Sequence, residues 1–252
     1  MDKTKIFAHR GARGYAPENT LEAFALAVSQ KADGIELDVQ LTRDGVPVVI
    51  HDETIDRVTS KTGYVKDYTL KELKKLTVME KRFPAYPSSK IPTLEEVLDA
   101  VKASGIWVNI ELKTGIYWYP EIEQKVAQIV QKCDMEHRVI YSSFNHYSIQ
   151  KIKQIVPEAE TAYLYSDVIW NVTDYAKNTK VDGIHPAVYH IKMADFLNEY
   201  IKSGLNVRVW TVNDTTDMKW LIEAGVTAVI TNYPDVAVKI REQRENQNHA
   251  GK

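Results

Sequence analysis

Two acidic residues and a histidine lie close together in the stretch from Gly34 to Glu53. An Asp-Gly pair at positions 44–45 separates two apolar runs, which is typical of a β-hairpin. Because side chains alternate along a strand, Glu36 and Asp38 share one face. A turn centred between residues 44 and 45 places Asp38 opposite His51, with their Cβ atoms about 5 Å apart. Such a cluster is costly to bury without a cation, and a hard divalent metal ion is the natural candidate. The alternative is a polar strand face turned to water.

A second strand repeats this pattern. In the stretch Asn109-Ile110-Glu111-Leu112-Lys113 the polar residues occupy alternate positions and therefore share one face. The three carboxylates Glu36, Asp38 and Glu111 suit Mg²⁺ or Ca²⁺, which prefer oxygen ligands. The sequence has one cysteine and no histidine pair at helical metal-binding spacing, so a structural zinc site is not predicted.

His9 and Arg10 follow a short apolar strand at the beginning of the chain. Two imidazoles, His9 and His51, can divide the work of a general acid and a general base. Arg10 and Lys113 add two fixed cations beside the metal ion, so the expected ligand is a dense anion, with phosphate the best candidate. Each residue also has a structural alternative: a loop cap for His9, a surface ion pair for Arg10, and a ladder pair for Glu111 with Lys113.

Composition limits the class of protein. The chain has 252 residues, of which 44% are hydrophobic and 26% charged, as in ordinary globular proteins. Its net charge of -2 gives no general affinity for nucleic acid or anionic membranes. No apolar run approaches the ~20 residues of a membrane span, so stable membrane insertion is not expected. The first residues enter a strand without the apolar run of a secretory signal, and Cys133 is the single cysteine. We therefore expect a cytoplasmic protein.

Short apolar strands alternate with amphipathic helices from residue 94 to residue 245. This alternation over about 250 residues favours a somewhat irregular (β/α)8 barrel in one domain, residues 1–252, rather than a doubly wound open sheet. The pattern gives one strand more than eight, so either the short strand at 183–185 or the second strand of the hairpin is irregular. Residues 52–90 hold turn signals and one short helix, and we expect them to form a small insertion after the third strand.

The polar residues belong to motifs that resemble one known family. These motifs are His9-Arg10-Gly11, Pro17-Glu18-Asn19-Thr20, Glu36-Leu37-Asp38-Val39, the run 45–52 ending in His51-Asp52, Glu111-Leu112-Lys113, Val209-Trp210-Thr211-Val212-Asn213 and Thr231-Asn232-Tyr233-Pro234-Asp235. Together they resemble the glycerophosphodiester phosphodiesterase family as far as about residue 235. Its members are TIM barrels related to the phosphatidylinositol-specific phospholipases C. They use a divalent metal to hydrolyse glycerophosphodiesters, such as glycerophosphocholine, to glycerol 3-phosphate and an alcohol.

The resemblance implies a role for each motif residue. His9 and His51 would be the acid–base pair, and a single Mg²⁺ or Ca²⁺ would be held by Glu36, Asp38 and Glu111. Arg10 and Lys113 would bind the phosphate, while Phe144 and Trp210 would lie against the glycerol or the leaving group. From its position alone, Trp210 either lines the mouth of the barrel or packs in the core. Residues 52–90 match the family insertion that covers the mouth of the barrel.

Two other functions remain open at this point. A lysophospholipase D or phospholipase C relative would act on lipid and would need an apolar rim, for which the sequence offers Tyr117-Trp118-Tyr119. A non-catalytic phosphate-binding barrel would be expected to lack a histidine or a carboxylate, and all are present. The expected partner is a small glycerophosphodiester substrate; the sequence specifies no oligomer.

Overall fold

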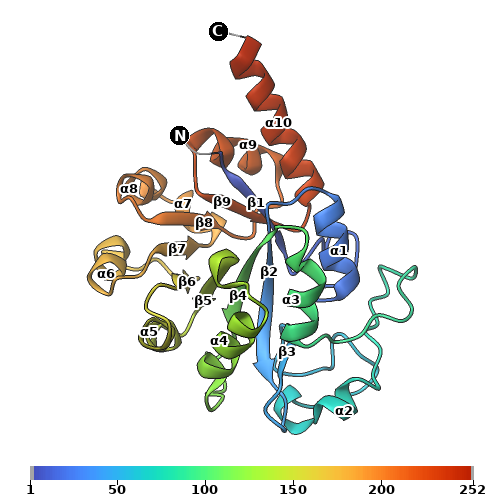
Figure 1. Cartoon of the computed structure of the whole chain (residues 1–252). Coiled ribbons are helices and arrows are strands. Elements are labelled where there is room, and N and C mark those ends of the chain that lie inside the picture. The colour runs from blue at the N-terminus through green and yellow to red at the C-terminus, as the bar shows by residue number, and fades with distance from the viewer. Residues whose placement is uncertain (1–2, 251–252) are drawn as a thin grey trace.

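The structure, a computed structural model, describes residues 3–250 and contains a closed parallel barrel (Figure 1). Strands β1 and β2 pair with each other, and the remaining barrel strands follow in the order β9, β8, β7, β6, β5 and β4 back to β2. These eight parallel strands form a TIM barrel, as predicted. The barrel strands are β1 (Lys5–His9), β2 (Gly34–Leu41), β4 (Trp107–Leu112), β5 (Val139–Ser143), β6 (Glu160–Tyr165), β7 (Gly183–Pro186), β8 (Asn206–Val209) and β9 (Ala228–Thr231).

Helices surround the barrel and connect successive strands (Figure 1). Several begin at the side-chain caps that the sequence predicts. Thr20 accepts a hydrogen bond from the backbone of Ala23, and Thr93 forms a reciprocal capping box with Glu96. The helices are α1 (Leu21–Ser29), α2 (Leu70–Leu73), α3 (Leu94–Lys102), α4 (Ile122–Lys132), α5 (His146–Ile155), α6 (Val172–Asn178), α7 (Val188–Ile191), α8 (Phe196–Lys202), α9 (Thr215–Ala224) and α10 (Pro234–Ala250), with short 3-10 turns η1 (Val65–Asp67) and η2 (Glu136–Arg138).

Alternation along the strands divides the buried side chains into two sets. Outward residues such as Ile35 and Leu37 pack against the helices in the main core. Inward residues include Phe7, Ile140 and Ala162, which fill the barrel interior. Gly34 lies beside Phe7 on the neighbouring strand, and a Cβ at position 34 would lie 2.4 Å from the Phe7 ring. A larger residue at position 34 would collide with the ring, so glycine is required there. The apolar inward residues fill one end of the barrel, and the polar inward residues of β1, β2 and β4 lie at the other end.

The ninth strand is the second strand of the hairpin, β3 (Pro47–Val49), which pairs antiparallel with the projecting end of β2. Its register differs from the expected one by one residue. Gln40 pairs with Val48, and the backbone N–H of Ile50 bonds to the carbonyl of Asp38. The prediction that Asp38 lies opposite His51 was therefore wrong. Residue 42 bonds to residue 46, so the connection is a three-residue loop centred on residue 44. Gly45 in this loop adopts a φ of 75°.

Residues 50–93 form a small lobe beside the hairpin, in the lower part of Figure 1, and have their own core. Ile55, Val65 and Leu73 are buried in that core. The lobe lies at the end of the barrel toward which the strands point. It contacts the β4–α4 loop through the rings of Tyr64 and Tyr117, which meet edge to face with their centroids 5.7 Å apart.

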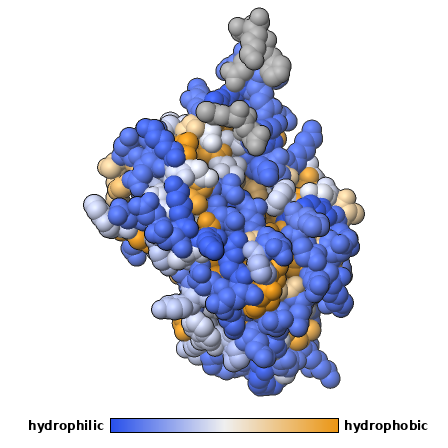
Figure 2. Space-filling model, turned by 60° about the vertical axis from the view of Figure 1, so that its left-hand side comes forward, coloured by the Kyte–Doolittle hydropathy of each residue, from blue (hydrophilic) through white to orange (hydrophobic). Residues whose placement is uncertain are grey.

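The surface is mostly hydrophilic on the side shown in Figure 2, with apolar residues in small patches. Within residues 3–250, no helix combines the length and the hydropathy that crossing a membrane requires.

Candidate active site

The polar residues singled out by their motifs meet at the carboxyl ends of the barrel strands. A pocket of about 160 Å³ opens there. In TIM barrels this end of the strands carries the reactive groups. The pocket is lined by His9, Arg10, Glu36, His51, Asn109, Glu111, Phe144, Leu164, Trp210 and Ile230. Seven of the nine residues selected from the sequence thus line one cavity, and the other two, Asp38 and Lys113, form ion pairs with lining residues.

The three carboxylates are held together by the pairing of β2 with β4. Asp38 lies beside Glu111 in the register, and Glu36 lies beside Asn109. One oxygen from each carboxylate can be chosen so that all three lie within 4.8 Å of one another. Burial, followed by the charges of neighbouring carboxylates, raises the pKa of Glu36. Burial also raises the pKa of Glu111, because it penalises the charged carboxylate more than the neighbouring Lys113 stabilises it.

These carboxylates fit a hard divalent cation. They are buried and offer only oxygen atoms, the donor type that Mg²⁺ and Ca²⁺ prefer. Asp38 Oδ1 and Asn109 Oδ1 are also buried and lack a hydrogen-bond partner within residues 3–250. Buried oxygens without a donor are costly, and a bound cation would satisfy them. Asn109 is thus a further oxygen donor for the site, and the sequence analysis gave it no role.

His9 is fixed by a residue from the other end of the chain. Its Nδ1 lies 2.8 Å from Asn232 Oδ1, and because an amide oxygen only accepts, Nδ1–H is the donor. Its Nε2 lies 4.0 Å from Glu36. Burial, together with the charge of Arg10, lowers the pKa of His9 to about 3. At neutral pH the imidazole is therefore uncharged, with an unprotonated Nε2 on the side of the carboxylates.

Arg10 is held by carboxylates on three sides. Its backbone N–H donates to Glu36 at 2.9 Å, and its guanidinium lies 3.0 Å from Glu18 and 3.3 Å from Asp38. A φ of 54° at Arg10 turns the chain directly after β1, so that both backbone and side chain face the site. Burial opposes ionisation of Asp38, but Arg10 and Lys113 hold the pKa of that carboxyl below its usual value.

Glu18 is the centre of a cluster of arginines that the sequence analysis did not identify. Its carboxylate lies 3.0 Å from Arg10, 2.9 Å from Arg13 and 2.7 Å from Arg57. Burial alone would raise the pKa of Glu18, yet these guanidinium groups lower it to about 2. The next residue, Asn19, donates to Asp38 at 2.8 Å. The run from Pro17 to Thr20 therefore positions both Arg10 and a carboxylate of the candidate metal site.

Lys113 stands at the end of β4 between two of the carboxylates. Its Nζ donates to Glu111 at 3.0 Å and lies 3.9 Å from Asp38. Burial opposes a charged amine, but Glu111 and Asp38 outweigh burial and raise the pKa of Lys113. The lysine is therefore a permanent cation beside the carboxylate cluster.

His51 lies two residues beyond the end of β3 and is supported by its neighbour. Nδ1 lies 2.6 Å from Asp52, whose other carboxylate oxygen lies 2.6 Å from Arg57 Nε. The hydrogen bond from His51 is the largest cause that lowers the pKa of Asp52, so this carboxylate is ionised at neutral pH. Nδ1–H is therefore the donor, and Nε2 remains available to a substrate.

A buried glutamine holds the backbone around His51. The side-chain amide of Gln40 lies 3.2, 3.0 and 2.7 Å from the carbonyl oxygens of residues 50, 51 and 52. Its own oxygen accepts from the Tyr119 hydroxyl at 2.8 Å. Gln40 is a polar residue at an inconspicuous strand position, and only the three-dimensional arrangement identifies it as support for the site.

Two aromatic side chains form one wall of the pocket. Phe144 and Trp210 meet edge to face, with ring centroids 5.6 Å apart. Trp210 Nε1 donates to the carbonyl of His185 at 2.7 Å, which fixes the indole in place. Trp210 therefore lines the mouth rather than the core, while Phe144 is 40% exposed and reaches from the pocket to the surface.

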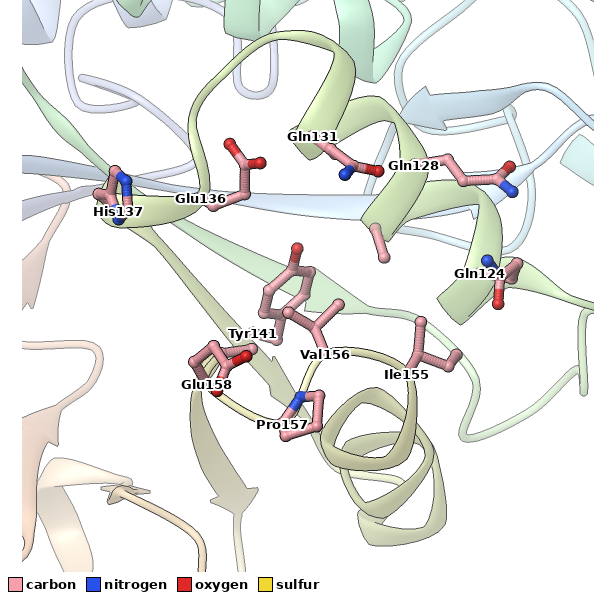
Figure 3. A pocket seen from close by; sticks show the side chains of 12 residues that line it. Gln124, Gln128, Gln131, Glu136, His137, Tyr141, Ile155, Val156, Pro157 and Glu158 are labelled. Carbon is pink, nitrogen blue, oxygen red and sulfur yellow. The ribbon is translucent and has the colours of Figure 1, made fainter.

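A larger pocket of about 400 Å³ lies elsewhere, outside the barrel between α4 and α5 (Figure 3). Tyr141 points into it, together with Gln124, Gln128 and Gln131 of α4. Within the described part of the chain, the carboxylate cluster of Glu36, Asp38 and Glu111 is the one group of side chains that could hold a metal ion, and it is not in this pocket. Size alone would therefore select the wrong cavity.

Comparison with known proteins assigns this architecture to one family. Residues 9–236 match the model of the Glycerophosphoryl diester phosphodiesterase family. A glycerophosphodiester phosphodiesterase of Bacillus altitudinis is 44% identical over 246 residues, which cover 95% of this chain and 99% of that protein. A protein of the same name from Caldanaerobacter subterraneus subsp. tengcongensis is 41% identical over 238 residues, covering 94% of this chain and 98% of that protein.

Solved structures agree with this assignment. The chain is similar to an Oleispira antarctica phosphodiesterase in complex with the product sn-glycerol-3-phosphate, with a TM-score of 0.88 and 27% identity over 95% of this chain and 97% of the other. It is also similar to a glycerophosphodiester phosphodiesterase of Agrobacterium tumefaciens, with a TM-score of 0.80 and 30% identity over 93% of this chain and 98% of the other.

Proposed function

The chain belongs to the glycerophosphoryl diester phosphodiesterase family and is a phosphoric diester hydrolase, and from this premise we propose that it cleaves glycerophosphodiesters to sn-glycerol 3-phosphate and an alcohol. The observation that carries the proposal is the meeting of two histidines, three carboxylates and two cations at one pocket. The product in the Oleispira antarctica complex supports the choice of glycerol 3-phosphate. The leaving alcohol is left open.

Substrate binding follows from the charges of the site. Arg10 and Lys113 are partly exposed cations that each lie close to Asp38, and we assign to them the phosphate oxygens of the substrate. Phe144 and Trp210 present apolar ring surface on the same pocket and suit the carbon atoms of glycerol or of the leaving group. A divalent cation held by Glu36, Asp38 and Glu111 would draw negative charge from the phosphate in the transition state.

The two histidines receive different roles in this proposal. Burial keeps His9 neutral, so its Nε2 accepts the proton of the attacking hydroxyl, whether that hydroxyl belongs to water or to the substrate glycerol. His51 is held by Asp52 through Nδ1, which leaves Nε2 facing the pocket, and we assign to Nε2–H the proton that goes to the departing alkoxide.

We further propose that residues 52–90 cover one side of the pocket mouth within a single domain. Arg57 of this segment reaches the buried Glu18 at 2.7 Å, and Tyr64 packs against the β4–α4 loop. These contacts connect the insertion to the arginine cluster at the start of the chain. The insertion would thereby help to orient both Arg10 and His51.

The direct test is release of glycerol 3-phosphate from glycerophosphocholine by the purified enzyme. We expect EDTA to abolish the activity and one of the two ions, Mg²⁺ or Ca²⁺, to restore it when added back. The ion that restores the activity identifies the metal. Glu36→Gln should weaken metal binding, measured by calorimetry, whereas His51→Ala should retain the metal and lose turnover. Absence of turnover with every ion tried would refute the proposed function.

The two histidine roles are separated by the leaving group. A 4-nitrophenyl ester of glycerol phosphate expels a weakly basic phenolate that needs little protonation. We expect His51→Ala to lose much less activity on this ester than on glycerophosphocholine, whereas His9→Ala should lose similar activity on both. The opposite pattern would exchange the two roles.

A further inference from the structure

Exposed apolar side chains are distributed unevenly over this molecule. Six of them, apart from Phe144, Val168 and Tyr175 in the same region, lie in the connections that follow four neighbouring strands, β4 to β7, or at the start of the helix after one. We call these six residues the aromatic rim: Ile116, Trp118, Tyr147, Trp170, Tyr189 and Met193. Trp170 is 88% exposed and Tyr147 is 78% exposed, although large aromatic side chains are usually well buried.

The opposite end of the barrel has no equivalent. Within residues 3–250, every exposed large hydrophobic side chain lies in a strand-to-helix connection, in the first turns of the helix that follows one, or in the insertion. The loops that lead from helices back into strands carry none of them. Scattered exposed apolar residues need no explanation, but a concentration at one end marks an interaction surface.

The aromatic rim is continuous with the pocket. Phe144 lines the pocket and is itself 40% exposed, and it lies three residues before Tyr147, which is in the first turn of α5. Neighbouring loops are joined, since the Tyr189 hydroxyl donates to the carbonyl of Ser166 at 2.9 Å. A protein bound stably on the aromatic rim would cover the entrance to the pocket, whereas a phospholipid surface presents phosphodiester groups to it.

The charges near the aromatic rim indicate which lipid surface fits. Apart from Lys113 in the site, the four connections carry one lysine, Lys192, and three acids, Glu121, Asp167 and Asp195. Lys192 is paired with Asp217. These four connections therefore offer little attraction for anionic headgroups, and Lys66 of the insertion, which lies over the Tyr117 ring, is paired with Asp67. Tryptophan and tyrosine, by contrast, favour the boundary between acyl chains and headgroups, because each ring has a large apolar body and a polar tip.

We propose that the aromatic rim docks the barrel mouth on a zwitterionic phospholipid surface, without insertion of a helix. This inference rests on the proposed function, because a phospholipid surface is chosen as the one that presents phosphodiester groups to the site. It extends the substrates of that site to glycerophosphodiesters held at a lipid–water interface. The affinity comes from burial of aromatic side chains rather than from charge. It should therefore change little with salt, because salt screens only electrostatic attraction.

The test is co-sedimentation of the holoenzyme with phosphatidylcholine vesicles. We expect the wild type to partition onto them equally at about 0.05 M and about 0.5 M NaCl. The double variant Trp118→Ser/Trp170→Ser should lose about tenfold in partitioning, because two large apolar surfaces are removed. A control adds Glu158→Trp to the double variant, which places a tryptophan at an exposed position of the opposite end, and it should not restore partitioning.

Each outcome decides between docking and its alternatives. Wild-type protein that stays in solution, or a double variant that sediments like the wild type, would overturn the proposal and leave the aromatic rim to a protein partner or a second copy. Binding only to phosphatidylserine vesicles at low salt would also overturn it. Turnover of soluble glycerophosphocholine, which the double variant should retain within about twofold, tests the proposed function separately.

Discussion

Replacement of Asp52 by Asn tests whether the carboxylate behind His51 contributes to catalysis. The two side chains are joined by a hydrogen bond of 2.6 Å, and about 30% of each is exposed. An asparagine keeps the shape of the residue but removes its charge. It can also present its amide N–H₂ to Nδ1, which would favour the wrong tautomer of His51.

The expected loss follows from the electrostatic interaction of the protonated His51 with Asp52. Unit charges about 4 Å apart interact by about 2 kcal/mol at an effective dielectric constant of about 40, a value between water and a mostly buried site. His51 must carry a positive charge before it can donate a proton from Nε2, and a charged form that costs about 2 kcal/mol more to reach raises the barrier equally and slows the reaction about 30-fold. We therefore expect kcat on glycerophosphocholine to fall about 30-fold, with a smaller change in KM, because the carboxylate does not touch the substrate.

The assay is steady-state release of glycerol 3-phosphate at saturating metal. Asp67→Asn is the matched control, because Asp67 lies in the same insertion, is exposed, and pairs with Lys66 at 3.1 Å. That control should keep the wild-type kcat. If Asp52→Asn retained kcat within about threefold, Asp52 would have only a structural role and the reasoning would be refuted.

Three further changes test the stability of the structure that supports the site. Glu18→Gln should lower the free energy of unfolding at pH 7 by about 3 kcal/mol, because it leaves three guanidinium groups around a neutral buried amide. Since the pKa of Glu18 is about 2 in the folded protein and 4.5 in the reference state, the difference from wild type should shrink as the pH falls below 4.5; a constant difference in urea titrations would contradict this. Gly34→Ala should cost about 1–3 kcal/mol through its clash with Phe7, and Phe7→Leu in the same chain should recover part of that loss; equal stability of Gly34→Ala and wild type would show that the barrel can adjust. His185 is fully buried beside Arg208, and burial keeps its pKa well below 6.5. As the pH falls below 6.5, the unfolded chain binds a proton at His185 that the folded protein does not bind. The free energy of unfolding therefore falls. From pH 7.5 to pH 5.5 the wild type should therefore lose about 1.4 kcal/mol more unfolding free energy than His185→Gln, and equal losses in denaturant titrations would show that His185 is not neutral when folded.

Much of the barrel and the grouping of its polar residues could be predicted because they depend on short-range periodicity. Alternation along β2 and β4 is a local property, and it places Glu36, Asp38 and Glu111 on the inward face whatever the rest of the chain does. Parallel strands then bring their carboxyl ends together. The same logic predicted one strand more than eight and left two candidates for the irregular one; the structure keeps the strand at 183–186 in the barrel and places β3 outside it.

The register of the hairpin could not be read in this way. An Asp-Gly pair fits both a two-residue and a three-residue loop. The choice depends in part on a contact that is distant in sequence: the Asp44 carboxylate accepts from the nearby Thr42 Oγ1 at 2.7 Å, but also from the backbone of Leu70, 26 residues away, at 2.9 Å. The cluster around Glu18 was missed for a similar reason, because Arg57 lies 39 residues away and no spacing rule connects the two.

The hydrogen bond between His9 and Asn232 has a consequence for synthesis of the protein. His9 ends the first strand, and Asn232 follows the last one, so the site contains residues from both ends of the barrel sequence. Strand β1 pairs with β9 as well as with β2. A chain growing on the ribosome therefore keeps one edge of β1 unpaired and its imidazole unanchored until the final strand emerges. Catalytic competence should thus arrive last, at closure of the barrel, and any chain that stops before residue 228 should be inactive however well its carboxylates are placed.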